Sequence, residues 1–161
     1  MKKENINISA LADKEGCFDL QFRKDVRKER LNSPTYYRFK AQFVITNTKD
    51  VLEKIKKHFG CGNIHLIKNQ ARYSVQNVGE LKDVIIPYFT AAPLTGKKKS
   101  DFDLWSQGVE IIHKNKGKVF SSWEKADFQR LIDIQKASVK FKDKPRDSKW
   151  IDWAQDLVKT L

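Results

Sequence analysis

Apolar and polar residues alternate in two separate segments of the chain. The alternation runs from Phe18 to Arg23 and again from Tyr37 to Thr46. A period of two residues places the apolar side chains on one face of a β-strand and the polar side chains on the other. The stretch between the two segments, residues 27–34, is polar and turn-like, with the sequence RKERLNSP. We therefore predict a long β-hairpin whose aromatic face packs against helices.

The rest of the chain shows helical spacing interrupted by two shorter strands. A helix is expected from a cap at Thr48 through Phe59, with Gly60 as its stop. Strands are expected around residues 63–67 and 72–76, with a turn near residues 69–70. The remaining predicted helices cover residues 80–89, residues 101–115, residues 121–139 from an S-S-W-E capping box, and residues 150–161. We find no internal repeat.

The segment before the first strand is rich in small residues and ends in an acidic residue. It runs from Ile8 through Ala12 to Glu15 and Gly16, and the first strand follows without a linker. This order places a carboxylate at the end of a predicted helix, where a packed interface could hold it beside a nucleic acid.

The composition adds a strong positive charge to this picture. A chain of 161 residues fits one domain with a sizeable core, and 40% hydrophobic with 32% charged residues is typical of a globular protein. The net charge is +12, and the isoelectric point is near 9.7. Such an excess indicates a polyanionic partner, most often a nucleic acid. The alternative is that the lysines only keep a small protein soluble.

Several other classes of protein do not fit the sequence. Two cysteines cannot form a disulfide framework, and neither has the spacing of zinc ligands. Three scattered histidines give no metal site. The chain shows no signal peptide and no apolar run of membrane-spanning length, so we expect a soluble intracellular protein without a membrane partner.

The polar face of the predicted sheet supplies candidates for base recognition. A two-stranded ribbon fits the major groove of DNA, where arginine reads guanine and glutamine or asparagine reads adenine. By alternation, the candidates are Asp19, Gln21, Arg23, Asp25, Arg38, Lys40, Gln42, Asn63, His65, Arg72, Ser74 and Gln76. Candidates for phosphate contacts are Lys97, Lys99, Lys114, Lys116, Lys118, Lys140 and Lys142. The alternative is that these residues solvate an exposed sheet face.

Two segments and the order of the elements resemble one protein family. Residues 8–16, with the sequence ISALADKEG, are similar to the LAGLIDADG motif of homing endonucleases, with Glu15 at its acidic position and Gly16 at its glycine. The segment from Pro93 to Phe102 is similar to the proline-leucine, lysine and Asp-Phe stretch of the same family. The resemblance covers about residues 6–115. It implies an α+β fold, αββαββα, in which four antiparallel strands form a saddle on DNA and C-terminal helices are added.

The same resemblance implies a function. We expect one domain over residues 1–161, with a core of about 6–116 and a helical extension of about 117–161. A single motif per chain implies a homodimer in which two motif helices pack through their small residues, namely Ser9, Ala10 and Ala12. The alternative is a helix packed only on its own sheet. The implied activity is site-specific cleavage of double-stranded DNA by an intron-encoded enzyme, located in the cytoplasm or in the organelle of its host intron.

The resemblance also implies roles for individual residues. Glu15 is the expected ligand of Mg²⁺, with the carbonyl of Gly16 as a further ligand; Mn²⁺ is the expected alternative metal, and Ca²⁺ is expected to support binding without cleavage. Lys98 is expected to stabilise charge on the phosphate, with Lys97 or Lys99 as alternatives. Asn47 is expected either to orient the attacking water or to cap the following helix.

Two further functions remain open from the sequence. The same fold could serve as a non-cleaving RNA maturase or as a DNA-binding protein. An unrelated basic module, such as a ribosome-associated protein, would bind nucleic acid in a salt-sensitive and weakly specific way.

Overall fold

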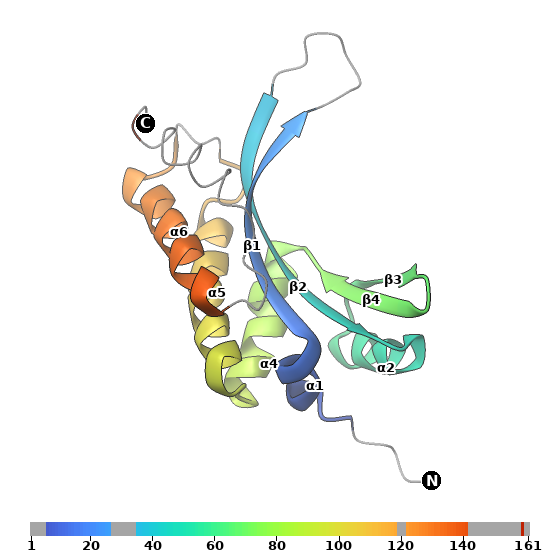
Figure 1. Ribbon diagram of the computed structural model, residues 1–161. Coiled ribbons are helices and arrows are strands. Elements are labelled where there is room, and N and C mark those ends of the chain that lie inside the picture. Colours follow the sequence, from blue (N-terminus) through green and yellow to red (C-terminus); the bar gives the residue numbers. More distant parts are fainter. Residues whose placement is uncertain (1–5, 27–34, 119–121, 142–158, 160–161) are drawn as a thin grey trace.

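The computed structural model describes residues 6–26, 35–118, 122–141 and 159. One antiparallel sheet and a set of helices form the molecule (Figure 1). The strands are β1 (Gly16–Val26), β2 (Thr35–Asn47), β3 (Asn63–Ile67) and β4 (Gln70–Val75). The helical elements are α1 (Ile8–Glu15), α2 (Lys49–Phe59), α3 (Val78–Glu80), the π-helical η1 (Leu81–Ile85), α4 (Ile86–Ala91), α5 (Gly96–Lys114), α6 (Lys125–Ser138) and the 3-10 helix η3 (Val139–Phe141). The α+β fold and the αββαββα order are confirmed.

The sheet has the strand order β1-β2-β4-β3. The β1–β2 hairpin pairs Gly16 with Ile45 at one end and Val26 with Thr35 at the other. Strand β4 pairs with only the Phe43–Asn47 part of β2. The distal half of the hairpin therefore extends beyond β3 and β4, and the sheet is curved and twisted along it (Figure 1).

The aromatic face of the sheet is covered by α4, α5 and α6. Phe18 is 1% exposed, and its ring lies 5.2 Å from that of Phe43 on the neighbouring strand. The ring of Phe89 on α4 lies 5.5 Å away and that of Trp105 on α5 lies 5.0 Å away. Aromatic rings at such separations contribute packing energy beyond their buried area. The alternation of apolar and polar residues thus leaves the opposite face of the sheet polar, as predicted.

Two helices begin at residues other than the predicted ones. Helix α5 begins at Gly96, five residues before the predicted start, because its N-cap Thr95 is held by Asp13 of α1. The Asp13 carboxylate accepts from the backbone N–H of Thr95 at 3.0 Å and from its hydroxyl at 3.1 Å. Helix α6 begins at Lys125 with Glu124 as its N-cap, so the predicted capping box does not start it.

The helix predicted over residues 80–89 is longer and contains a wider turn. Helical backbone continues from Val78 to Ala91 through α3, η1 and α4. The N–H of Ile86 bonds to the carbonyl of Leu81, five residues earlier. Pro87 has no N–H to donate, which favours such a local π-turn. The helix predicted over residues 150–161 lies outside the described residues.

The helices of the described part of the chain are short or polar on the scale of a lipid bilayer. Within residues 6–26, 35–118 and 122–141, no helix combines the length and the apolar character needed to cross a membrane.

Candidate functional site

Residues from three segments that are distant in sequence meet where α1 runs into β1. Glu15 ends α1, Gly16 begins β1, and Asn47 ends β2. Because Gly16 pairs with Ile45, the end of β2 lies beside the end of α1, and the side-chain amide of Asn47 donates to Glu15 Oε2 at 2.8 Å. The ammonium of Lys98 donates to the backbone carbonyl of Gly16. The fold thus brings Glu15, Gly16, Asn47 and Lys98 together.

Gly16 is required at this junction by a close approach rather than by a turn. A Cβ at this position would lie 2.7 Å from the carbonyl oxygen of Ala12 and 2.9 Å from its Cα. Ala12 itself is 0% exposed and belongs to the hydrophobic core. The strand can therefore follow the helix without a linker only if residue 16 has no side chain. Glu15, the last residue of the helix, is exposed at this junction.

The three lysines at the start of α5 have different partners. Lys98 is half-buried and reaches Gly16. Lys99 forms an ion pair with Asp103 one turn later, at 2.9 Å, and Lys97 is exposed. They lie on the first turn of the helix and not in a preceding loop, because α5 begins at Gly96. Of the three lysines, Lys98 is the one that the structure brings to the α1–β1 junction.

The amide of Asn47 has a defined orientation. Its carbonyl oxygen accepts from the backbone N–H of Thr48 at 2.7 Å, so its NH₂ group is turned toward Glu15 at 2.8 Å. The N-cap of α2 is Thr48, whose side chain makes no capping bond. Asn47 therefore accepts from the backbone N–H of Thr48, the N-cap of α2, and donates to the carboxylate of Glu15.

The donor atoms at the junction suit a hard cation. The Glu15 carboxylate and the Gly16 carbonyl are oxygen ligands, which Mg²⁺ prefers, and Mg²⁺ usually keeps several waters beside one or two carboxylates. Within the described residues, no group of three or more His, Cys, Asp or Glu side chains is placed to hold a metal. The residues fit Mg²⁺, provided that water, DNA phosphates or a second copy supply further oxygens.

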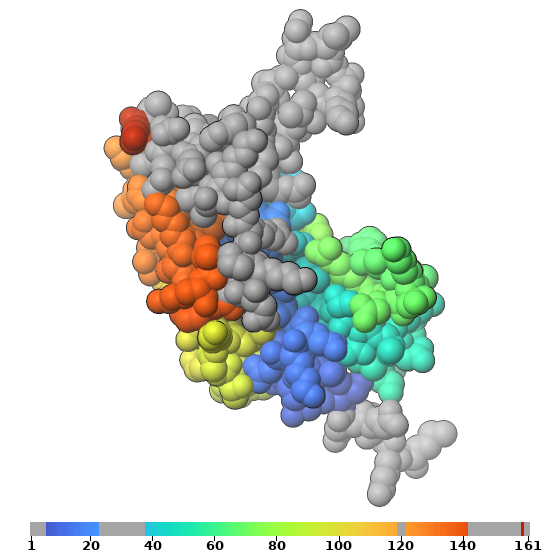
Figure 2. Space-filling model, viewed as in Figure 1, coloured from blue at the N-terminus to red at the C-terminus, as the bar shows by residue number. Residues whose placement is uncertain are grey.

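The small residues of α1 lie on different sides of the helix. Ala10 is exposed, whereas the hydroxyl of Ser9 donates to the carbonyl of Ala92 at 2.8 Å. Ala12 differs from the expectation for an interface, because it has no exposed surface left for a partner. Leu11 is half-buried beside Ala10; the sequence pattern did not single it out. In Figure 2 the blue atoms of the described N-terminal part, from residue 6 onward, lie at the surface between the α5–α6 side and the α2–β3–β4 side.

A side-chain network crosses the polar face of the sheet. Asp19 Oδ2 accepts from the amide of Gln21 at 2.6 Å and from that of Gln42 on β2 at 3.0 Å. The carbonyl oxygen of Gln42 accepts from the amide of Gln76 at 3.3 Å. Asp19 and Gln42 are only 6% and 7% exposed, whereas Gln76 is exposed and Gln21 is half-buried.

The other predicted DNA-contacting residues are spread over the same face. Ser74 is 2% exposed. The partly or fully exposed members are Arg38, Lys40, Asn63, His65 and Arg72. Arg23 and Asp25 lie on β1, opposite Arg38 and Tyr36, and their side chains are outside the described part of the structure.

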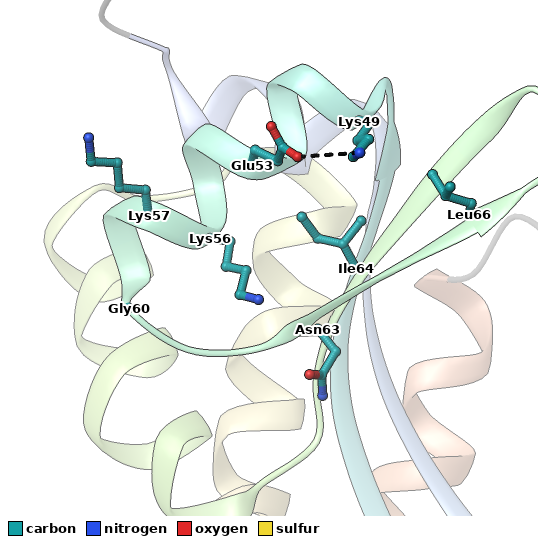
Figure 3. Close-up of a pocket in the computed structure, with 8 residues that line it drawn as sticks. All are labelled: Lys49, Glu53, Lys56, Lys57, Gly60, Asn63, Ile64 and Leu66. Atoms are coloured by element: carbon teal, nitrogen blue, oxygen red, sulfur yellow. Dashed lines mark ion pairs between the residues drawn. The ribbon is translucent and has the colours of Figure 1, made fainter.

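A basic hollow of about 690 Å³ lies between α2 and β3. Its rim carries Lys49, Lys56 and Lys57, and Ile64 and Leu66 of β3 line its other side. Figure 3 shows Lys49 paired with Glu53, at 3.7 Å, and Lys56 extending toward β3. The sequence pattern did not single out these lysines, although their recurrence along one predicted helix is a signal that could have found them.

The chain matches a known family and several known proteins. The family model described as LAGLIDADG endonuclease matches residues 8–109. "Probable intron-encoded endonuclease 3" of Neurospora crassa is 28% identical over 103 residues, which are 61% of this chain and 18% of that protein. "Uncharacterized 50.9 kDa protein in ND4 intron 1" of Podospora anserina is 34% identical over 115 residues, which are 68% of this chain and 24% of that protein. The chain thus spans about a fifth to a quarter of these relatives.

Solved structures share the fold. The archaeal intron-encoded homing endonuclease I-Vdi141I, complexed with DNA, superposes with a TM-score of 0.74 at 20% identity, covering 95% of this chain and 92% of that chain. I-SmaMI, bound to an uncleaved DNA target in the presence of calcium ions, superposes with a TM-score of 0.70 at 18% identity, covering 91% of this chain and 47% of that chain. At these identities the likeness concerns the fold.

Proposed function

The chain belongs to the LAGLIDADG endonuclease family, a family of DNA endonucleases, and from that premise we propose that it is an intron-encoded, Mg²⁺-dependent, homodimeric enzyme that cleaves double-stranded DNA at a specific site. The observation that carries the proposal is the convergence of Glu15, Gly16, Asn47 and Lys98 at one surface junction. A protein that only binds nucleic acid has no need for an exposed carboxylate held by an amide beside a half-buried ammonium.

The mechanism assigns one task to each residue of the junction. The Glu15 carboxylate and the Gly16 carbonyl would hold the divalent ion, which would activate water and stabilise charge on phosphate oxygens. Asn47 keeps Glu15 in one orientation through its 2.8 Å bond, and partners of ligating carboxylates commonly tune metal affinity in this way. The Lys98 ammonium lies beside the same carbonyl, where it can donate to an oxygen of the scissile phosphate and stabilise its charge.

The number of carboxylates and the exposed side of α1 support the homodimer. One chain presents a single acid at the junction, and cleavage of both strands needs one such site for each strand. Ala10 is exposed on the helix that carries Glu15, so a second copy packed there would bring two Glu15 side chains to the same DNA.

A two-fold complex makes a further demand on the target. The same protein surface must read both half-sites, so the target should be long and near-palindromic. The polar sheet face provides base contacts, and lysines such as Lys56 beside β3 provide phosphate contacts. The net charge of +12 supports strong electrostatic attraction to the duplex.

The experiment separates binding from cleavage. Bound sequences are selected from a random DNA pool with Ca²⁺ present, and Mg²⁺ is then added to the bound DNA. The wild type is compared with Glu15→Gln, which keeps the shape but removes the charge. The control is Glu110→Gln, the same change on α5, where Glu110 pairs with Lys82 at 3.6 Å.

Each outcome decides the proposal. Cutting at one near-palindromic site by the wild type and by Glu110→Gln, but not by Glu15→Gln, supports the endonuclease and the role of the carboxylate. Selective binding without cutting by any of the three proteins would leave a sequence-specific binding protein. Recovery of no enriched sequence would remove specific DNA recognition as well.

The oligomeric state is tested separately. Sedimentation of the complex with its selected DNA should give two protein chains per duplex. Ala10→Arg places a long charged side chain on the exposed side of α1 and should give a single chain per duplex at protein concentrations where the wild type gives two, with loss of double-strand cutting. A complex of two chains that is unchanged by Ala10→Arg would show that α1 is not the interface.

A further inference from the structure

The hydrogen-bond network on the polar sheet face carries an inference that rests on the proposed function. Asp19, Gln21 and Gln42 meet on neighbouring strands, because Asp19 pairs with Gln42 and Gln21 lies two residues along the same face. Val75 pairs with Phe43, so Gln76 continues to the place opposite Gln42. The order of contacts is Gln21 to Asp19, Gln42 to Asp19, and Gln76 to Gln42.

A carboxylate gives this network a direction. An ionised aspartate only accepts hydrogen bonds, whereas an amide has a donating end and an accepting end. Gln21 and Gln42 must therefore turn their NH₂ groups toward Asp19, at 2.6 and 3.0 Å. The carbonyl of Gln42 then faces Gln76 and accepts from its NH₂ group at 3.3 Å. One nearly buried carboxylate, 6% exposed, thus determines how three amides are oriented.

The orientation decides what the two outer amides offer to a ligand. Gln21 and Gln76 each use one N–H inside the network, which leaves a carbonyl oxygen and one N–H among the contacts of the described residues. Gln76 also lines an open hollow of about 300 Å³ that it shares with Arg38 and Lys40. Adenine presents one acceptor and one donor in the major groove, and therefore matches an acceptor beside a donor. Guanine presents two acceptors there and matches two donors instead.

We propose that Asp19 is a positioning residue that makes Gln21 and Gln76 read adenine rather than guanine. Asp19 does not contact DNA in this arrangement, and neither does Gln42, which is 7% exposed. This replaces the expectation that all four residues contact bases. The substrate class is a half-site with adenine at the two base positions that face Gln21 and Gln76.

Asp19→Asn provides the test, because asparagine has the shape of aspartate but is not restricted to accepting hydrogen bonds. An asparagine can accept or donate, so the whole chain of amides can reverse and turn NH₂ groups outward, which matches guanine. Sequences are selected with Ca²⁺ alone, so cleavage is not needed. The wild type should prefer adenine over guanine roughly 10- to 100-fold at both positions. In Asp19→Asn the two purines should be selected within about threefold of each other, and pyrimidines should still be rejected.

Two further variants separate the positioning role of Asp19 from general effects of a changed charge or of lost stability. Asp83→Asn makes the same change of charge at an exposed residue of η1 and should keep the adenine preference. Gln42→Met interrupts the chain between Asp19 and Gln76, so it should relax the position read by Gln76 and leave the one read by Gln21. Thermal unfolding checks that the variants are folded; if Asp19→Asn is not, Gln42→Met carries the test.

The outcomes distinguish this inference from the proposed function. An unchanged adenine preference in Asp19→Asn, or equal relaxation at every base position, would overturn the positioning role while leaving the endonuclease intact. A wild-type target without two adenines per half-site would do the same. Recovery of no selected sequence by the wild type would overturn both proposals.

Discussion

Replacement of Gly16 by alanine tests the proposed geometry of the α1–β1 junction most directly. The new Cβ would lie 2.7 Å from the carbonyl oxygen of Ala12, about 0.7 Å short of ordinary contact at 3.4 Å. The neighbouring Ala12 Cα at 2.9 Å is also backbone, so no flexible side chain can move aside. Overpacking of this kind typically costs about 1–3 kcal/mol of folding free energy. We expect urea unfolding of Gly16→Ala to give a free energy of unfolding that is lower than that of the wild type by an amount in this range.

Gly16→Ala should also slow DNA cleavage by protein that remains folded. Helix α1 must shift relative to β1, which moves Glu15 away from Asn47 and the Gly16 carbonyl away from Lys98. A misplacement of about 1 Å in a catalytic group can lower a rate roughly 100-fold. We therefore expect a cleavage rate at saturating DNA that falls by about this factor, measured at a temperature where the variant is folded.

The matched control is Gly60→Ala at the C-cap of α2. Gly60 has φ of +73°, and apart from its two chain neighbours no atom of the described residues lies within 4 Å of the place that an added methyl group would take, so alanine should cost roughly 1–2 kcal/mol through backbone strain alone. This variant should lose stability but keep the cleavage rate. A Gly16→Ala protein with wild-type stability and rate, or an equal loss of cleavage in both variants, would refute this reasoning.

Four shorter predictions concern the site and the helices that support it. Asn47→Ala should raise the Mg²⁺ concentration needed for cleavage about 10- to 100-fold, measured by metal titration, and an unchanged midpoint would contradict its role. Lys98→Met should lower the cleavage rate at saturating DNA while Lys99→Met should not, because Lys99 is paired with an aspartate one turn away. Lys114 of α5 donates a hydrogen bond to Asp127 of α6 and holds the pKa of that carboxyl below its ordinary value. This pair therefore stabilises the α5–α6 contact above about pH 4 and loses its effect as the pH falls through the lowered pKa. Asp127→Asn should lower the melting temperature at pH 7 and should change it less at pH 3. DNA affinity should fall linearly on a double-logarithmic plot against salt, with a shallower slope for Lys56→Gln.

Much of the fold could be predicted because it depends on local patterns. The alternation from Phe18 to Arg23 and from Tyr37 to Thr46 indicated β1 and β2, and both strands are present with the aromatic face inward. The cap at Thr48 and the stop at Gly60 bound α2 as predicted. Each of these signals is read from neighbours within one or two turns of the chain, which a sequence displays directly.

Contacts between distant residues could not be read in this way. The start of α5 depends on Asp13, 82 residues before Thr95, and no local rule places a cap so far away. The burial of Ala12 depends on how closely β1 leaves α1, so a small residue that indicated an interface turned out to lie in the core. For Lys98, the sequence left three adjacent lysines as candidates, and only the packing of α5 against the junction distinguishes them.

The sequence by itself determined the periodic elements, the basic character and the motif residues, because these depend on residue type and spacing alone. The tertiary structure decided which of these residues meet. It placed Asn47 at Glu15 and Lys98 at Gly16, since strand pairing and helix packing join segments that are far apart in the chain. It also gave the amides on the sheet face a common direction from Asp19, because hydrogen-bond polarity is a property of groups in contact and not of their order along the chain.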